Sequence, residues 1–208
     1  MFLIKTTVQF ALAIIRKIMV TSSAGVPDLA GMREWKKKTY PGGGESMEIE
    51  RQFLVSVLPD LSVDFELLEQ GYVALVPEIR FRSVNHERFY LTVKRGAGLS
   101  REEWETEITA AEYANLKDRL FPGTCVIRKR RYHLPLSDGH IAELFVHDGH
   151  LSGLNYVEVE FAAESEARAF TPPLFFGREV TDDARFSYGA LAREDGMKVV
   201  HEILAGGA

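Results

Sequence analysis

The chain has little cysteine, no excess of positive charge and no long uncharged apolar run. Its 208 residues include one cysteine, Cys125, which excludes an intrachain disulfide and a zinc site built from several thiolates. The formal net charge of −5 argues against a general binder of nucleic-acid duplexes, which needs a positive surface. Lys5, Arg16 and Lys17 interrupt the apolar stretch 2–20 before it could cross a bilayer. Together these absences favour a cytoplasmic location and no membrane partner.

The composition predicts one globular domain with additions at its two ends. With 46% hydrophobic and 26% charged residues, the chain can bury a substantial core. We expect an N-terminal extension over 1–46, a domain over 47–193 and a C-terminal tail over 194–208. The linker-like stretch 40–44 and the position of Met47 favour a true start at Met47. An amphipathic surface helix within the extension is the alternative interpretation.

Two segments alternate acidic and apolar residues with the period of a β-strand. In 47–55, Glu48 and Glu50 share one face, and the apolar residues Ile49, Phe53 and Val55 share the other. Residues 156–161 repeat the design with Glu158 and Glu160. One such pair usually marks a solvated strand face, but its recurrence points to a shared acidic site.

Further segments carry basic or mixed charges with the same period. They place together Arg80 and Arg82 in 78–82, Thr92 and Lys94 in 90–94, and Lys129 and Arg131 in 126–132. Positions 101, 103, 105 and 107 also share a face, and 142–147 places Glu143 beside Phe145 and His147. An ordinary sheet with one solvated face would explain any single strand.

So many charged strands favour closure of the sheet. We predict an α+β, mainly β fold: an eight-stranded antiparallel closed barrel that gathers these faces into one charged lumen. There, carboxylates can hold a divalent cation and basic groups can hold a polyanion. Helices over 110–120, with a capping box from Thr109 and Glu112, and over 164–170 would cover the apolar outer faces. Turns are predicted at 95–98 and 136–139.

These motifs resemble, in order, those of the CYTH domain, or triphosphate tunnel metalloenzyme, over about residues 47–193. The opening Glu-x-Glu pattern is Glu48 and Glu50. The later matches are 70–72, Arg80 with Arg82, 91–94, Arg101 with Glu103 and Glu105, 129–132, Glu143 with Leu144, 158–160 and 177–181. Single motifs of this length are weak signals, but this number in one order is specific. The sequence is most similar to short bacterial members, some of which hydrolyse inorganic tripolyphosphate.

The resemblance, together with the charge pattern, implies a metal-dependent triphosphatase. Mg²⁺ or Mn²⁺ would be bound by Glu48, Glu50, Glu158 and Glu160. The triphosphate would be bound by Arg80, Arg82, Lys94, Lys129, Arg131 and Arg185. Glu143 and Gln52 are the candidate catalytic residues, with Glu143 orienting the attacking water. The expected partner is therefore a small molecule that contains a triphosphate, and a homodimer is left open.

The sequence departs from the family pattern at two positions. Gln52 stands where the opening motif has lysine, so a hydrogen-bonding amide replaces a charge. Tyr188 stands where an asparagine is expected after Arg185. Three other functions therefore stay open: a class IV adenylate cyclase, a thiamine triphosphatase and a noncatalytic binder of triphosphate or polyphosphate. Gln52 is the residue that favours the last of these.

Removal of residues 1–46 is expected to leave a folded domain with unchanged phosphate release, because every charged strand pattern begins at or after Met47. Circular dichroism and a phosphate-release assay on the chain starting at Met47 test this expectation. Insolubility of the shortened chain would show that the extension is structural.

Overall fold

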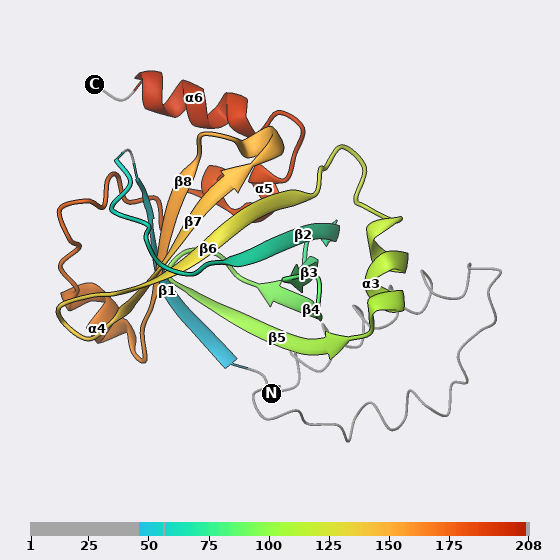
Figure 1. Cartoon of the computed structure of the whole chain (residues 1–208), viewed down its shortest axis with the longest axis horizontal. Coiled ribbons are helices and arrows are strands. Elements are labelled where there is room, and N and C mark those ends of the chain that lie inside the picture. Colours follow the sequence, from blue (N-terminus) through green and yellow to red (C-terminus); the bar gives the residue numbers. More distant parts are fainter. Residues whose placement is uncertain (1–45, 56, 207–208) are drawn as a thin grey trace.

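Eight antiparallel strands form a closed barrel in this computed structural model, which describes residues 46–55 and 57–206. The order around the barrel is β1-β5-β4-β3-β2-β6-β7-β8 (Figure 1). The strands are β1 (Ser46–Leu54), β2 (Glu66–Leu75), β3 (Glu78–Val84), β4 (Arg88–Arg95), β5 (Ser100–Ile108), β6 (Ile127–Pro135), β7 (Ile141–Asp148) and β8 (Asn155–Glu160). The predicted closed eight-stranded barrel is confirmed.

Strand β1 closes the barrel by pairing with β5, its neighbour in the order, and with β8, which stands at the other end of the order. Its first half pairs with β5, where Glu48 lies opposite Arg101. Its second half pairs with β8, where Glu50 lies opposite Glu160 and Gln52 opposite Glu158. Because opposite residues in a ladder point to the same face, this register brings acidic residues from both ends of the domain into one lumen.

Short helices connect the strands and cover the barrel. They are α3 (Ala110–Lys117), α4 (Glu164–Ala169), α5 (Tyr188–Leu191) and α6 (Gly196–Gly206), with 3-10 turns η1 (Gly149–Leu151) and η2 (Ala184–Phe186). The predicted capping box of α3 is confirmed, because the Thr109 side chain accepts from the Glu112 amide and Glu112 accepts from the Thr109 amide. In Figure 1, α3 and α4 lie on different sides of the barrel and α6 lies beyond one end.

Two apolar clusters lie outside the barrel. Tyr113 and Leu116 of α3 pack on Phe81, Leu91 and other residues of β3 to β5. A second cluster joins α4 to β1, β6, β7 and β8, and its members are Phe53, Val55, Tyr132, Ala142, Leu144, Val157, Val159, Phe161, Ala167, Phe170 and Phe176. The sequence predicts that helices cover the apolar outer faces of the strands. These two clusters confirm it for α3 and α4, because the outward apolar side chains of the strands are buried against both helices.

A third cluster fills part of the lumen itself. Tyr72, Phe145 and Tyr156 point inward from β2, β7 and β8, and they pack against Tyr188 and Leu191 of α5. The lumen is therefore not charged along its whole length. One part is an apolar core partly supplied by the C-terminal segment, and the charged residues occupy the remainder.

Three features differ from the expectation or fall outside the structure. Strand β2 appears in no charge pattern, because Leu68, Gln70 and Tyr72 on its inward face are uncharged and only Glu66, at its start, carries a charge on that face. The expected tail over 194–208 contains a helix, α6, whose Val200 is buried in the third cluster. The extension over residues 1–45 lies outside the described residues. No helix among residues 46–55 and 57–206 is long and apolar enough to span a membrane.

Candidate functional site

The charged part of the lumen encloses a cavity of about 200 Å³. Its walls carry carboxylates and cations in nearly equal number. The carboxylates are those of Glu48, Glu78, Glu103, Glu105, Glu143, Glu158 and Glu160, and the cations are Arg80, Arg82, Lys94, Arg101, Lys129 and Arg131. Burying such charges is costly unless each sign is compensated. The cavity therefore has the composition of a site for an anion together with a cation.

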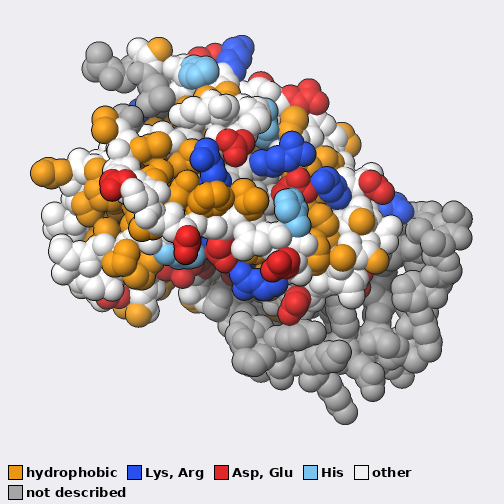
Figure 2. Space-filling model, in the orientation of Figure 1, with side chains coloured by type: hydrophobic (Ala, Val, Ile, Leu, Met, Phe, Trp, Pro, Cys, Tyr) orange, Lys and Arg blue, Asp and Glu red, His pale blue; other side chains and the backbone are white. Residues whose placement is uncertain are grey.

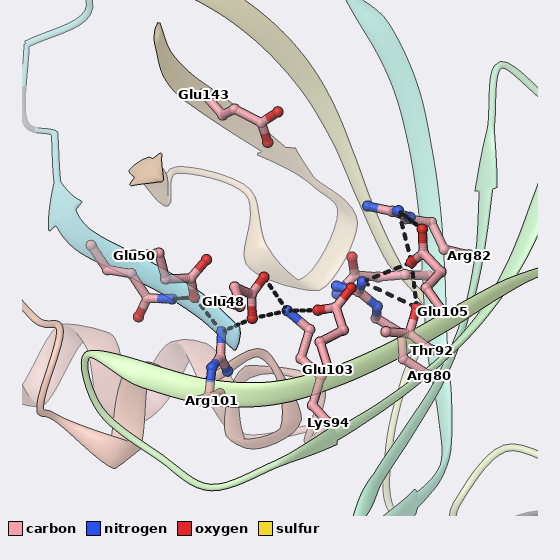
Figure 3. A network of polar contacts seen from close by, with 12 residues as sticks. Glu48, Glu50, Arg80, Arg82, Thr92, Lys94, Arg101, Glu103, Glu105 and Glu143 are labelled. Carbon is pink, nitrogen blue, oxygen red and sulfur yellow. Dashed lines mark hydrogen bonds and ion pairs between the residues drawn. The ribbon is translucent and has the colours of Figure 1, made fainter. Parts of the chain in front are cut away.

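Lys94 connects acidic side chains from β1 and β5 (Figure 3). Its Nζ lies 2.7 Å from Glu48 Oε1 and 2.8 Å from Glu103 Oε2. Arg101 Nη2 lies 3.2 Å from Glu48 Oε2 and also contacts Glu50. Burial opposes ionisation of Glu48, but Lys94 and Arg101 outweigh it and lower the pKa of this carboxyl to about 2. Glu48 is thus ionised and already paired.

Arg80 and Arg82 share the carboxylate of Glu105. Arg82 Nη2 lies 3.0 Å and Arg80 Nη2 3.6 Å from Glu105 Oε2, and the Thr92 hydroxyl donates to the same oxygen at 2.7 Å. The Nε groups of both arginines are buried and have no hydrogen-bond partner among the described residues. Each guanidinium therefore keeps a donor for a ligand in the lumen.

Arg131 connects acids of β2 and β7. Its Nη2 lies 2.5 Å from Glu66 Oε2, and its Nη1 lies 3.1 Å from Glu143 Oε1. His133 Nε2 is also 3.1 Å from Glu143 Oε1. Glu143 lies opposite Glu158 in the ladder between β7 and β8. Glu143 is therefore held by basic groups on one side while it lines the cavity on the other.

Glu158 and Glu160 face the cavity without a hydrogen bond or ion pair to any described residue. Burial, followed by the neighbouring carboxylates, raises the pKa of both side chains. Burial and the carboxylates of Glu158 and Glu48 also raise the pKa of Glu50, to about 8. A bound divalent cation would relieve this repulsion, and oxygen ligands are those that Mg²⁺ prefers. The donor set therefore fits a metal, although no three acidic or histidine side chains converge to metal-binding distance within residues 46–55 and 57–206.

Gln52 is held between two side chains of the barrel. Its Nε2 donates to Glu50 Oε1 at 2.6 Å, and its Oε1 accepts from the Tyr156 hydroxyl at 2.7 Å. Both ends of the amide are thus occupied. Gln52 does not line the central cavity, but it lines a wider opening of about 690 Å³ that shares Glu78, Lys94 and Arg101 with that cavity.

The structure brings most of the predicted site residues together. Those that line the central cavity are Glu48, Arg80, Arg82, Lys94, Lys129, Arg131, Glu143, Glu158 and Glu160. Glu50 and Gln52 lie beside it, joined through Arg101 and Tyr156. Arg185 is not brought to the cavity, because its exposed guanidinium pairs with Asp183 at 2.6 Å. A local ion pair outside the lumen therefore holds this side chain.

Several cavity residues carry no role in the sequence prediction. Arg101, Glu103 and Glu105 share one face of β5, and the period of that strand was a sufficient signal to include them. Tyr72 and Tyr188 line the cavity from β2 and α5. Tyr72 belongs to the matched motif 70–72 and Tyr188 to a position that departs from the family pattern, but neither signal gives these tyrosines a place in the lumen, because tertiary packing brings α5 against the barrel.

The fold and the site define a tunnel-type β-barrel protein whose lumen suits a polyanion and a cation.

No family model matches the chain. An inorganic triphosphatase of Nitrosomonas europaea is 43% identical over 150 residues, which are 70% of this chain and 96% of that protein. A second inorganic triphosphatase, of Acetivibrio thermocellus, is 35% identical and covers 67% of this chain and 88% of its own length. A crystal structure of an inorganic triphosphatase superposes with a TM-score of 0.54 at 39% identity, covering 70% and 93% of the two chains. The chain belongs to the CYTH family of triphosphate tunnel metalloenzymes, with the short bacterial inorganic triphosphatases.

Glu158→Gln is expected to stabilise the protein at pH 8 in a chelating buffer. The pKa of Glu158 is raised from 4.5, so the folded state favours its protonated form. The stability that this carboxyl contributes is full below pH 4.5 and is lost as the pH rises through the folded-state pKa. The difference between variant and wild type should therefore grow with pH in thermal unfolding.

Adding Mg²⁺ should reduce or reverse the difference in thermal stability between Glu158→Gln and wild type. The reason is that wild type would gain more stability from bound metal than the variant. Glu87→Gln, an exposed change in the turn after β3, is the control. An equal effect of both substitutions at every pH would show that Glu158 carries no uncompensated charge.

Proposed function

We propose that this protein hydrolyses inorganic tripolyphosphate to pyrophosphate and orthophosphate in the lumen, with Mg²⁺ or Mn²⁺. The observation that carries the proposal is the arrangement of the cavity. Among the described residues, the same cavity is lined by arginines with free donors, by a lysine without an ion pair, and by the carboxylates Glu158 and Glu160, which have no ion pair either. A triphosphate together with a divalent cation would compensate both sets of charges at once. The relatives named inorganic triphosphatase support this substrate.

The metal would be held by Glu158 and Glu160, with Glu48 and Glu50 as further ligands. Glu48 and Glu50 are now engaged by Lys94 and Arg101, so these two cations would exchange a carboxylate for a phosphate oxygen when substrate and metal bind. A bound divalent cation would neutralise charge on the phosphoryl oxygens and make a coordinated water more acidic.

The basic residues would grip the substrate and stabilise its transition state. Arg80, Arg82 and Arg131 can each offer paired donors to phosphate oxygens, and Lys94 and Lys129 offer point charges. These groups sit on strands of a closed barrel, so little reorganisation is needed as charge shifts during the reaction. Glu143, which contacts Arg131 and His133, would orient the water and accept its proton as the terminal P–O bond breaks.

A noncatalytic triphosphate binder is the second candidate, and Gln52 is the observation that favours it. Its amide carries no charge and is fully engaged by Glu50 and Tyr156. A class IV adenylate cyclase or a thiamine triphosphatase would place the organic group of its substrate in the wide opening beside Gln52. The residues that line this opening form no evident pocket for a base.

A cytoplasmic location and a homodimer stay predictions from the sequence. On the face shown in Figure 2, acidic and basic side chains are interspersed, which fits the expected absence of a nucleic-acid partner.

Tripolyphosphate is expected to be hydrolysed faster than ATP or thiamine triphosphate, and only with Mg²⁺ or Mn²⁺. Phosphate release from the three substrates, with and without each metal, measures this preference, and a parallel assay tests for cyclic AMP. Glu158→Gln purified in the same way controls for a contaminating phosphatase and should lose most of the activity. Equal or faster turnover of ATP, or formation of cyclic AMP, would reject the inorganic substrate.

Gln52→Lys is expected to raise turnover of tripolyphosphate by up to roughly 10²-fold. The reason is that a cation beside Glu50 adds one charged contact to phosphate oxygens in the transition state. Gln52→Met, which keeps the length without charge, is the matched control and should not show the gain. A lysine variant that binds tripolyphosphate as tightly as wild type but hydrolyses it no faster would mean that another cation already fills this role. An inactive wild type with an active lysine variant would support the binding module.

A further inference from the structure

Lys129 differs from every other cation of the central cavity in its partners. Arg80, Arg82, Lys94, Arg101 and Arg131 each have a carboxylate oxygen within 4 Å, at distances that reach 3.6 Å for Arg80. Among the described residues, Lys129 has no such ion pair, although its side chain is 4% exposed. Burial and the nearby arginines lower its pKa well below the ordinary value. Some other feature must hold this amine in place.

Two aromatic rings hold the amine of Lys129. The Nζ lies 3.8 Å from the ring centre of Phe145 on β7 and 3.6 Å from that of Tyr188 on α5. Ring faces attract an ammonium group through their quadrupole, and this attraction is stronger where the group is desolvated. A ring carries no net charge, so the attraction of Lys129 for an incoming anion is not cancelled as it would be by a carboxylate.

His147, which lies opposite Lys129 in the ladder, does not change this balance. Its Nδ1 donates to the Leu154 carbonyl at 2.9 Å. Burial and the proximity of Lys129 lower the pKa of His147 to about 3, so the ring is neutral near pH 7. Lys129 therefore has aromatic and neutral neighbours on this side, and Glu158 is the acid with the largest effect on it, one that opposes the lowering of its pKa.

The position of Tyr188 is built into the end of the chain. The Ser187 side chain caps α5 by accepting from the Ala190 amide at 3.2 Å. A side chain at Gly189 would lie 2.5 Å from Glu78 Oε1, so glycine lets α5 sit against the barrel wall. The Tyr188 ring also makes edge contacts with Tyr156 and Phe145, at ring-centre distances of 5.6 and 6.2 Å. The ring is thus fixed from several sides.

We propose that Tyr188 is a positioning residue for substrate binding: with Phe145 it forms an aromatic seat that holds the Lys129 ammonium toward the cavity without a counter-ion. Lys129 is thereby the one cation of the central cavity, among the described residues, whose charge is not already in an ion pair with a carboxylate. This inference rests on the proposed function, and it assigns a role to the position where the chain departs from the family pattern.

The test compares Tyr188→Leu with Tyr188→Phe in steady-state hydrolysis of tripolyphosphate. Loss of the ring face should raise KM by about 2- to 30-fold, the range that corresponds to one cation–π contact, and should change kcat less. Tyr188→Phe keeps the face and should recover most of the wild-type KM. Phe145→Leu removes the other ring and should raise KM in the same way as Tyr188→Leu. It replaces Tyr188→Leu in the comparison if that variant does not fold.

A double-mutant cycle separates positioning from general destabilisation. In a Lys129→Met background, Tyr188→Leu should no longer raise KM, because its effect acts through the ammonium. Tyr132→Leu removes an equally buried tyrosine from the outer cluster, and it should lower the thermal midpoint without raising KM.

Three results would overturn the inference: a KM within twofold of wild type for both ring-deletion variants, equal effects of Tyr188→Phe and Tyr188→Leu, or additive effects with Lys129→Met. A wild-type protein without hydrolysis would overturn the proposed function instead. The role of Tyr188 would then be tested by calorimetric titration of tripolyphosphate into the same variants. Their dissociation constants would take the place of KM in each comparison.

Discussion

Compensation of charge inside the barrel is the constraint on which the rest of the structure depends. A closed sheet with apolar residues outside must place its alternate residues inside, and in this chain many of those residues are charged. Lys94, Arg101 and Arg131 each contact two carboxylates, so the strands are connected across the lumen as well as by their ladders. The apolar clusters with α3 and α4 then cover the outside.

Because of the same compensation, a ligand that binds the paired side chains of the lumen must replace their present partners. Most cations of the lumen are paired, while Glu158 and Glu160 form no ion pair with any residue that the structure describes. An anion that enters alone would compete with carboxylates for the basic groups, and a metal that enters alone would meet the repulsion of the same groups. Entry of both allows each charge to keep a partner, which explains physically why a triphosphatase of this design depends on metal.

The barrel could be predicted from the sequence because charge alternates on nearly every strand. Glu48 with Glu50 and Arg80 with Arg82 show a period of two that no helix would place on one face. Strand β2 lacked this signal because its inward residues Leu68 and Gln70 carry no charge. Arg185 was misplaced because its interaction with Asp183, two residues away, holds it outside the lumen. The tyrosine of α5 reaches the lumen only through tertiary packing, which no local pattern encodes.

The split pairing of β1 bears on how the molecule assembles. This strand is made before both of its neighbours, and the partner of its second half, β8, lies about a hundred residues later in the sequence. Contacts over such a separation form late and slowly, because a long loop must first be ordered. Until β8 is in place, Glu50 and Glu158 stay far apart and well hydrated. The acidic half of the lumen therefore exists only in the closed barrel, because the pairing of β1 with β8 is what brings these carboxylates together.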